Sequence, residues 1–106
     1  MDTANSAQFP HDDFWLALYN LLSPLAKAWV YNAHVPIWKR QESDTVSDIV
    51  QLAVTKTYIY LQGAHEQQIT VFSPERLSIV IAKRCFLDLR RRDLRLVHFS
   101  YDDPVA

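Results

Sequence analysis

A cluster of basic side chains in the last third of the chain is the strongest candidate for chemistry. Six cationic residues lie within thirteen positions, and only Asp88 and Asp93 oppose them. The six are Lys83, Arg84, Arg90, Arg91, Arg92 and Arg95. The cluster therefore carries +4 in a chain whose formal net charge is −1, so the remaining residues together carry −5. Such an asymmetry indicates an anion-facing patch on an otherwise acidic or neutral body.

This basic cluster has two interpretations. Arginine holds phosphate groups through paired hydrogen-bond donors, and Arg84, Arg91 and Arg95 are spaced to project from a similar side of a helix. The alternative is a solvated face with internal ion pairs, because Asp88 lies four residues from both Arg84 and Arg92. Such pairs contribute about 0.3–0.5 kcal/mol each. Composition leaves both interpretations open, because the rest of the domain is acidic.

A second row of polar side chains recurs at helical spacing in the middle of the chain. Asp44, Asp48, Gln51 and Thr55 are separated by four, three and four residues, which predicts that they share one face of a helix. Ordinary solvent exposure is one explanation of this row, and a protein-docking face is the other.

Four aromatic residues flank the basic cluster and the segment before it: Tyr58, Tyr60, Phe72 and Phe86. Core packing is the simpler explanation for each of them. Any that are exposed could stack on unpaired bases, a contact worth about 1–3 kcal/mol per base.

No set of residues is spaced for catalysis or for metal binding. The four histidines, His11, His34, His65 and His98, share no ligand spacing with one another or with Cys85. A single glycine cannot build a phosphate-cradling loop, and a single cysteine excludes an intrachain disulfide. We therefore expect no enzymatic activity, no metal and no cofactor. The absence of a signal peptide or a long apolar run predicts a cytoplasmic protein with no membrane partner.

The positioning elements are expected to be helices in one small domain. The chain has 106 residues, 49% of them hydrophobic, and one glycine leaves few tight turns. The prediction is an all-α bundle of three to four helices over residues 12–96. Residues 1–11 are expected to form a flexible tail, and residues 97–106 an extended tail or the start of a linker.

Local patterns predict where these helices begin and end. The first apolar helical stripe starts near residue 14 and is interrupted at Ser23-Pro24 by a bend or a kink, and the next break lies at 32–36. A second helix is predicted over 44–61, capped by Asp44 or Thr45 and closed by Gly63. The competing interpretation of residues 54–61 is a strand, since β-branched and aromatic residues are dense there.

The last helix is predicted to start at Ser73-Pro74-Glu75, after a connection over residues 64–72 that could include a short extended piece. Its expected buried stripe consists of Leu77, Val80, Ile81, Cys85 and Leu89.

Three segments together resemble a known family. Residues 46–54, VSDIVQLAV, are similar to a signature of region two of bacterial sigma factors. Residues 78–92, SIVIAKRCFLDLRRR, resemble the helix of that region that carries Ile-Ala-basic followed by Asp-x-x-Arg-Arg. Residues 14–30, FWLALYNLLSPLAKAWV, resemble its first helix. The similarity covers roughly residues 12–104 and is strongest to the extracytoplasmic-function group. Leu52, Leu77 and Arg84 replace the family's usual glutamate, tryptophan and asparagine.

The resemblance implies a sigma region 2 fold and two binding surfaces. One would dock on the β′ clamp helices of the RNA polymerase core through Asp44, Asp48, Gln51, Leu52 and Thr55. The other would hold the promoter minus-ten element as single-stranded DNA through Arg76, Lys83, Arg84, Arg90, Arg91, Arg92 and Arg95. The loop over residues 64–73 would shape a pocket for a flipped-out base.

Two alternatives to promoter binding remain open at this point. The resemblance also allows a protein-interaction domain of the same fold, with an anti-sigma factor or another regulator as its partner and no promoter reading. The second alternative is an unrelated helical bundle that binds duplex DNA.

Overall fold

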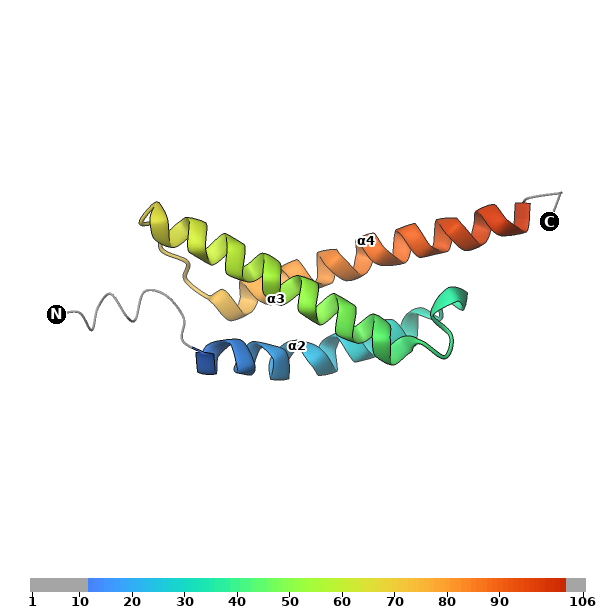
Figure 1. The fold of residues 1–106 in the computed structure, drawn as a ribbon, viewed down its shortest axis with the longest axis horizontal. Helices are drawn as coiled ribbons and strands as arrows, with labels where there is room; N and C mark the ends of the chain where they lie inside the picture. Colours follow the sequence, from blue (N-terminus) through green and yellow to red (C-terminus); the bar gives the residue numbers. More distant parts are fainter. Residues whose placement is uncertain (1–11, 103–106) are drawn as a thin grey trace.

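The computed structural model describes residues 12–102, with side chains through residue 95, and this part of the chain is all-helical. Its elements are α2 (Asp12–Ala33), the short 3-10 helix η1 (Pro36–Trp38), α3 (Glu42–Glu66) and α4 (Pro74–Asp102). The three long helices all contact one another, and α4 also contacts η1. Figure 1 shows α3 crossing obliquely in front of α4, with α2 below them. The end of α4 reaches beyond the other helices. The predicted all-α bundle is therefore confirmed.

The first helix continues through the proline that was expected to interrupt it. Pro24 lies inside α2, and Leu18, Leu22, Ala26 and Val30 are buried on both sides of it. Proline cannot donate the helical hydrogen bond to the carbonyl four residues earlier. The continuous apolar stripe, which is buried against α3 and α4, explains why the helix persists despite this loss.

Helix α3 is longer at both ends than the sequence predicted. It begins at Glu42, so neither Asp44 nor Thr45 caps it, and the Thr45 hydroxyl donates to the Gln41 carbonyl at 3.0 Å. The strand interpretation of residues 54–61 is wrong, because this segment is helical throughout. Gly63 lies inside the helix, which ends at Glu66 and is followed by Gln68 at φ 59°.

Helix α4 starts where the sequence predicted and ends later. The Ser73 hydroxyl oxygen accepts a hydrogen bond from the Arg76 backbone N–H at 3.2 Å, and Pro74 is the first helical residue. The extended tail expected after Arg95 is wrong as far as Asp102, because the backbone there is helical. The tail predicted over residues 1–11 and the final residues 103–106 lie outside the described residues.

One core joins the three helices. Its buried members are Leu22, Ala26, Val30, Val35, Trp38, Ile49, Val50, Ala53, Ala82, Cys85 and Phe86. The expected stripe on α4 was wrong at Val80, which is 66% exposed, whereas Ser78 and Ala82 are fully buried. The buried face therefore includes Ser78, whose hydroxyl donates to the Glu75 carbonyl, so its polar atom is satisfied within the core.

A buried side-chain hydrogen bond contributes to the packing. The Trp38 indole N–H donates to the Asp93 carboxylate at 2.6 Å, which joins η1 to α4.

Among the helices of the described chain, none has a stretch that is both apolar enough and long enough to cross a bilayer.

Candidate nucleic-acid and protein interfaces

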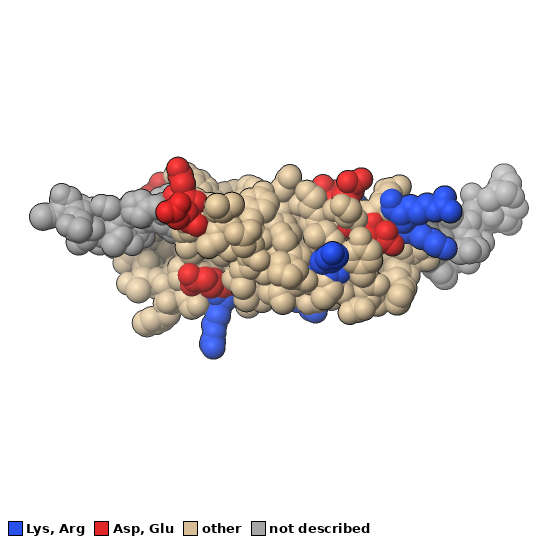
Figure 2. Space-filling model, turned by 90° about the horizontal axis from the view of Figure 1, so that it is seen from below, with Lys and Arg blue, Asp and Glu red and all other residues tan. Residues whose placement is uncertain are grey.

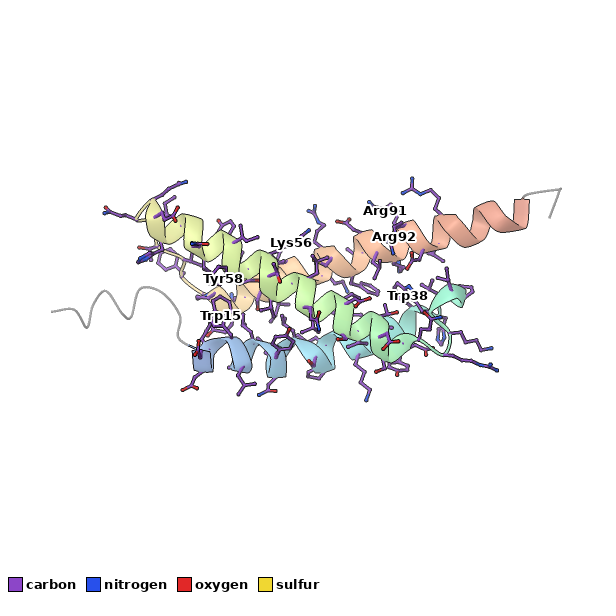
Figure 3. All side chains as sticks on the ribbon, in the orientation of Figure 1. Trp15, Trp38, Lys56, Tyr58, Arg91 and Arg92 are labelled. Carbon is purple, nitrogen blue, oxygen red and sulfur yellow. The ribbon has the colours of Figure 1, made fainter. Side chains whose placement is uncertain are left out.

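The predicted basic surface on α4 is solvent-exposed in full. Every one of its seven cationic residues is exposed: Arg76, Lys83, Arg84, Arg90, Arg91, Arg92 and Arg95. Arg84, Arg91 and Arg95 recur at spacings of seven and four, so a helix of 3.6 residues per turn brings them to one side. Figure 3 shows Arg91 and Arg92 on the part of α4 near Trp38.

Ion pairs neutralise little of this surface. Asp88 approaches Arg91 at 3.8 Å, with both side chains more than half exposed, and it forms neither of the predicted pairs with Arg84 and Arg92. Arg92 instead donates from Nε to Asp93 at 3.0 Å. The long, exposed pair between Asp88 and Arg91 contributes little to stability. The interpretation of the cluster as a face of internal ion pairs is therefore weakened.

Aromatic rings support two of the cations. The Lys83 ammonium lies 4.6 Å from the centre of the Trp29 ring and 5.4 Å from that of Phe86, and the Arg90 guanidinium lies 5.8 Å from the Phe86 ring. Such contacts restrain a cation while leaving it charged. Phe86 itself is buried at 4% exposure, so it packs in the core and does not present a face for stacking on a base.

The face on the side of α2 carries scattered charges. Figure 2 views the protein from the side of α2 and shows acidic and basic side chains in separate small groups on a mostly uncharged surface. No continuous basic band crosses the face visible there. All seven cations of the predicted basic surface belong to α4.

The predicted docking row on α3 is exposed along its full length. Asp44, Asp48, Gln51, Leu52 and Thr55 all lie on the surface. The sequence interpretation missed Ile59, which is 61% exposed and seven residues beyond Leu52, itself 46% exposed. Because seven residues make two helical turns, these two apolar side chains lie on the same face. That spacing was the signal that could have revealed Ile59.

The segment before α4 presents a fully exposed aromatic ring. Phe72 is 97% exposed, and Ile69 in the same connection is 55% exposed. The predicted loop over residues 64–73 is shorter than expected, because its first residues complete α3. A hollow of about 290 Å³ lies beside it and is lined by Ile59, Tyr60, Gly63, Ala64, Gln67 and Ile69.

Tyr58 and Tyr60 separate into different surroundings. Tyr58 is 40% exposed and its ring lies 5.4 Å from that of Trp15, so it joins α3 to α2 (Figure 3). Tyr60 is 54% exposed and lines two surface hollows. Of the four aromatics considered from the sequence, Phe72 and Tyr60 are therefore the most accessible.

The remaining candidate groups are the histidines, the acidic side chains and Cys85. Within residues 12–95, no three histidine, cysteine or acidic side chains gather into a metal site. Burial raises the pKa of the Cys85 thiol, an effect opposed by the positive charge of Lys56 and reinforced by Asp88. A thiol with a raised pKa is a poor nucleophile at neutral pH.

Comparison with protein-family models, curated proteins and solved structures finds no match to this chain.

Proposed function

We propose that the chain is a transcription-initiation domain of the sigma region 2 type. In this proposal α3 docks on the β′ clamp helices of the RNA polymerase core, and α4 holds the minus-ten element of the promoter as a single strand. The domain binds and positions its partners and performs no catalysis.

The observation that carries the proposal is the exposure of all seven cationic side chains on α4, together with the exposed ring of Phe72 in the segment that leads into this helix. Phosphate contacts supply affinity and position the strand, and contacts to bases supply sequence preference. Arginines at helical spacing suit the first task, and a free aromatic ring suits stacking on an unpaired base. The exposed polar row on α3 offers a separate surface for the polymerase.

A direct test measures fluorescence anisotropy of labelled single-stranded promoter DNA with the protein and polymerase core together. We expect preference for a minus-ten-like strand over a scrambled strand and over the same sequence as a duplex. Equal binding to all three would contradict promoter reading, and a preference for the duplex would favour an unrelated DNA-binding bundle.

The phosphate role is tested by salt dependence. Replacing Arg91 and Arg92 by Gln should make the slope of log K against log salt less steep by about 1.4, because each lost phosphate contact on a single strand removes about 0.7. Lys39→Gln with Arg40→Gln is a matched control, since these two exposed cations follow η1 and are not among the seven cations of α4. An unchanged slope in the Arg91 and Arg92 variant would count against phosphate binding there.

One observation favours a second candidate function. Leu52 and Ile59 add exposed apolar surface to the docking row of α3. Such surface is typical of protein interfaces. A sigma-like domain that binds an anti-sigma factor or another regulator, without reading promoters, would use the same face. Tight binding to such a partner with no measurable affinity for single-stranded DNA would support this alternative.

A further inference from the structure

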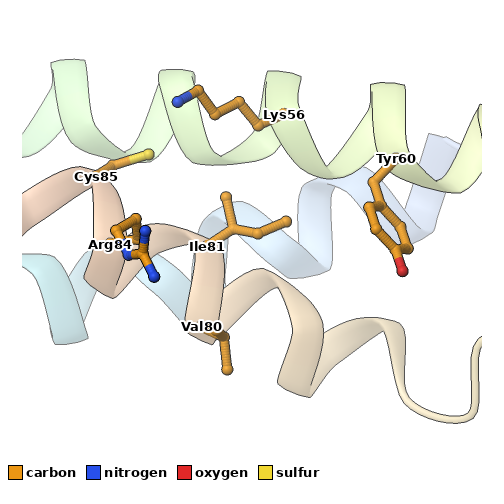
Figure 4. Close-up of a pocket in the computed structure, with 6 residues that line it drawn as sticks. All are labelled: Lys56, Tyr60, Val80, Ile81, Arg84 and Cys85. Carbon is orange, nitrogen blue, oxygen red and sulfur yellow. The ribbon is translucent and has the colours of Figure 1, made fainter.

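A hollow between α3 and α4 has apolar walls and two cations at its edge. It has a volume of about 350 Å³ and is lined by Lys56, Tyr60, Val80, Ile81, Arg84 and Cys85. Figure 4 shows Lys56 and Tyr60 contributed by α3 and the other four residues by α4. The docking row, on another side of α3, does not contribute to it.

The walls of this hollow leave apolar surface in water. Val80 is 66% exposed and Tyr60 is 54% exposed, whereas Cys85, which lines the same hollow, is buried. An apolar ligand seated here would remove that surface from water, which is the main source of affinity in small-molecule sites. The volume lies at the lower end of the range of such sites, so the ligand is small.

The two cations of the hollow indicate a ligand with an anionic group. Neither Lys56 nor Arg84 forms an ion pair with any acidic side chain in the described part of the chain. Two positive charges at one hollow repel each other, and an anionic group placed between them would relieve that repulsion. A cationic ligand would be repelled by these two residues.

We propose that this hollow binds a small single-chain aliphatic carboxylate, with its chain against Val80, Ile81 and Tyr60 and its carboxylate between Lys56 and Arg84. Arginine presents a planar pair of donors that suits a carboxylate, and lysine adds a point charge. The aliphatic lining favours a hydrocarbon chain over a polar body.

The probe for this site is decanoate, titrated below its micelle concentration into the isotopically labelled full chain and followed by backbone amide NMR. Saturable shifts are expected on α3 around Lys56 and Tyr60 and on α4 around Val80 to Cys85. Across octanoate, nonanoate and decanoate, affinity should rise about fourfold per added methylene, since each buried CH₂ contributes a constant increment.

The charge requirement has its own controls. Lys56→Met keeps a long apolar stem and removes the charge, so it should weaken decanoate binding at least fivefold, whereas Lys39→Met should leave binding unchanged. Decyltrimethylammonium has the same chain with a positive head and should bind at least tenfold more weakly than decanoate. Equal binding of the two amphiphiles, or affinity independent of chain length, would overturn the proposal.

Cys85 provides a second readout because it is the only cysteine of the chain. Bound decanoate should slow alkylation of this thiol by iodoacetamide, a neutral reagent that the cations do not attract. An unchanged rate at saturating decanoate would place the ligand elsewhere and overturn the assignment. None of these measurements involves DNA or polymerase, so their outcome is distinct from that of the proposed function.

Discussion

Trp38 and Asp93 form a buried hydrogen bond of 2.6 Å between side chains that are 55 positions apart in the sequence. Asp93 is 6% exposed and also accepts a hydrogen bond from Arg92, so its carboxylate is held from two directions. The bond joins η1 to α4.

Loss of this hydrogen bond should destabilise the fold. Trp38→Phe leaves a buried carboxylate oxygen without its indole donor, which costs about 1–3 kcal/mol in free energy of unfolding. Urea denaturation of Trp38→Phe, Asp93→Ala and the double variant separates the bond from the lost ring volume. A coupling energy of about 0.5–3 kcal/mol is expected between two residues in contact, and a coupling near zero would contradict the structural role.

Removal of the internal proline should stabilise the chain. Pro24 is exposed and lies inside α2, where it withholds one helical hydrogen bond. Pro24→Ala is expected to raise the free energy of unfolding by up to about 3 kcal/mol. Ala28→Gly, at an exposed position one turn later, should lower the free energy of unfolding by about 1 kcal/mol. This control verifies that helix propensity in the interior of α2 affects stability. No gain in the Pro24→Ala variant would mean that α2 already compensates for the proline.

The exposed ring of Phe72 gives a prediction that separates binding from folding. Phe72→Ala should leave the free energy of unfolding unchanged, because the ring is 97% exposed. If the ring stacks on a base, strand affinity should fall by about fivefold to a hundredfold. Leu16→Ala, at another exposed apolar position, is the control for both measurements. Wild-type strand affinity in the Phe72→Ala variant would exclude stacking.

The α3 surface can be tested with a matched pair of leucines. Leu52→Asp on α3 should weaken binding to polymerase core at least about fivefold, the loss typical of one important interface contact. Leu16→Asp on α2 introduces the same change at a position that is 63% exposed and should leave core binding unchanged. Equal effects of the two substitutions, measured by biolayer interferometry, would argue against a specific docking face.

The buried thiol makes stability depend on alkaline pH. Burial raises the pKa of Cys85, so the folded chain holds the thiol proton more tightly than the unfolded chain does. The thiol's contribution is therefore fully present below the unfolded pKa, and it is lost as pH rises from there through the folded pKa. Urea midpoints from pH 7 to 10 should fall more steeply for the wild-type chain than for Cys85→Ala. Parallel curves would contradict the raised pKa.

Local sequence signals predicted the helices better than their ends. The start of α4 follows from Ser73 and Pro74, which act within one turn, and the break near Pro36 follows from the conformational limits on the preceding residue. Pro24 and Gly63 were misleading because tertiary burial of α2 and α3 outweighs the local cost of these residues. The helical path beyond Arg95 carries no periodic apolar pattern, so no local signal predicted that α4 continues there.

The two surfaces were predicted in outline, and their detailed contacts were not. Helical spacing was sufficient to group Asp44 with Thr55 and Arg84 with Arg95. The ion pairs of Asp88 with Arg91 and of Arg92 with Asp93 join near neighbours, and spacing alone did not select them over the predicted pairs of Asp88 with Arg84 and Arg92. The exposure of Val80 depends on how α4 packs against α2 and α3, which no local pattern records.

The position of Lys83 over Trp29 has an optical consequence. An ammonium group 4.6 Å from an indole ring imposes a strong local electric field, and the emission energy of tryptophan responds to such a field. A polyanion that draws Lys83 away from the ring would alter the fluorescence of Trp29. With Trp15 and Trp38 replaced by phenylalanine, the protein would carry its own spectroscopic signal for occupation of α4, without an added dye.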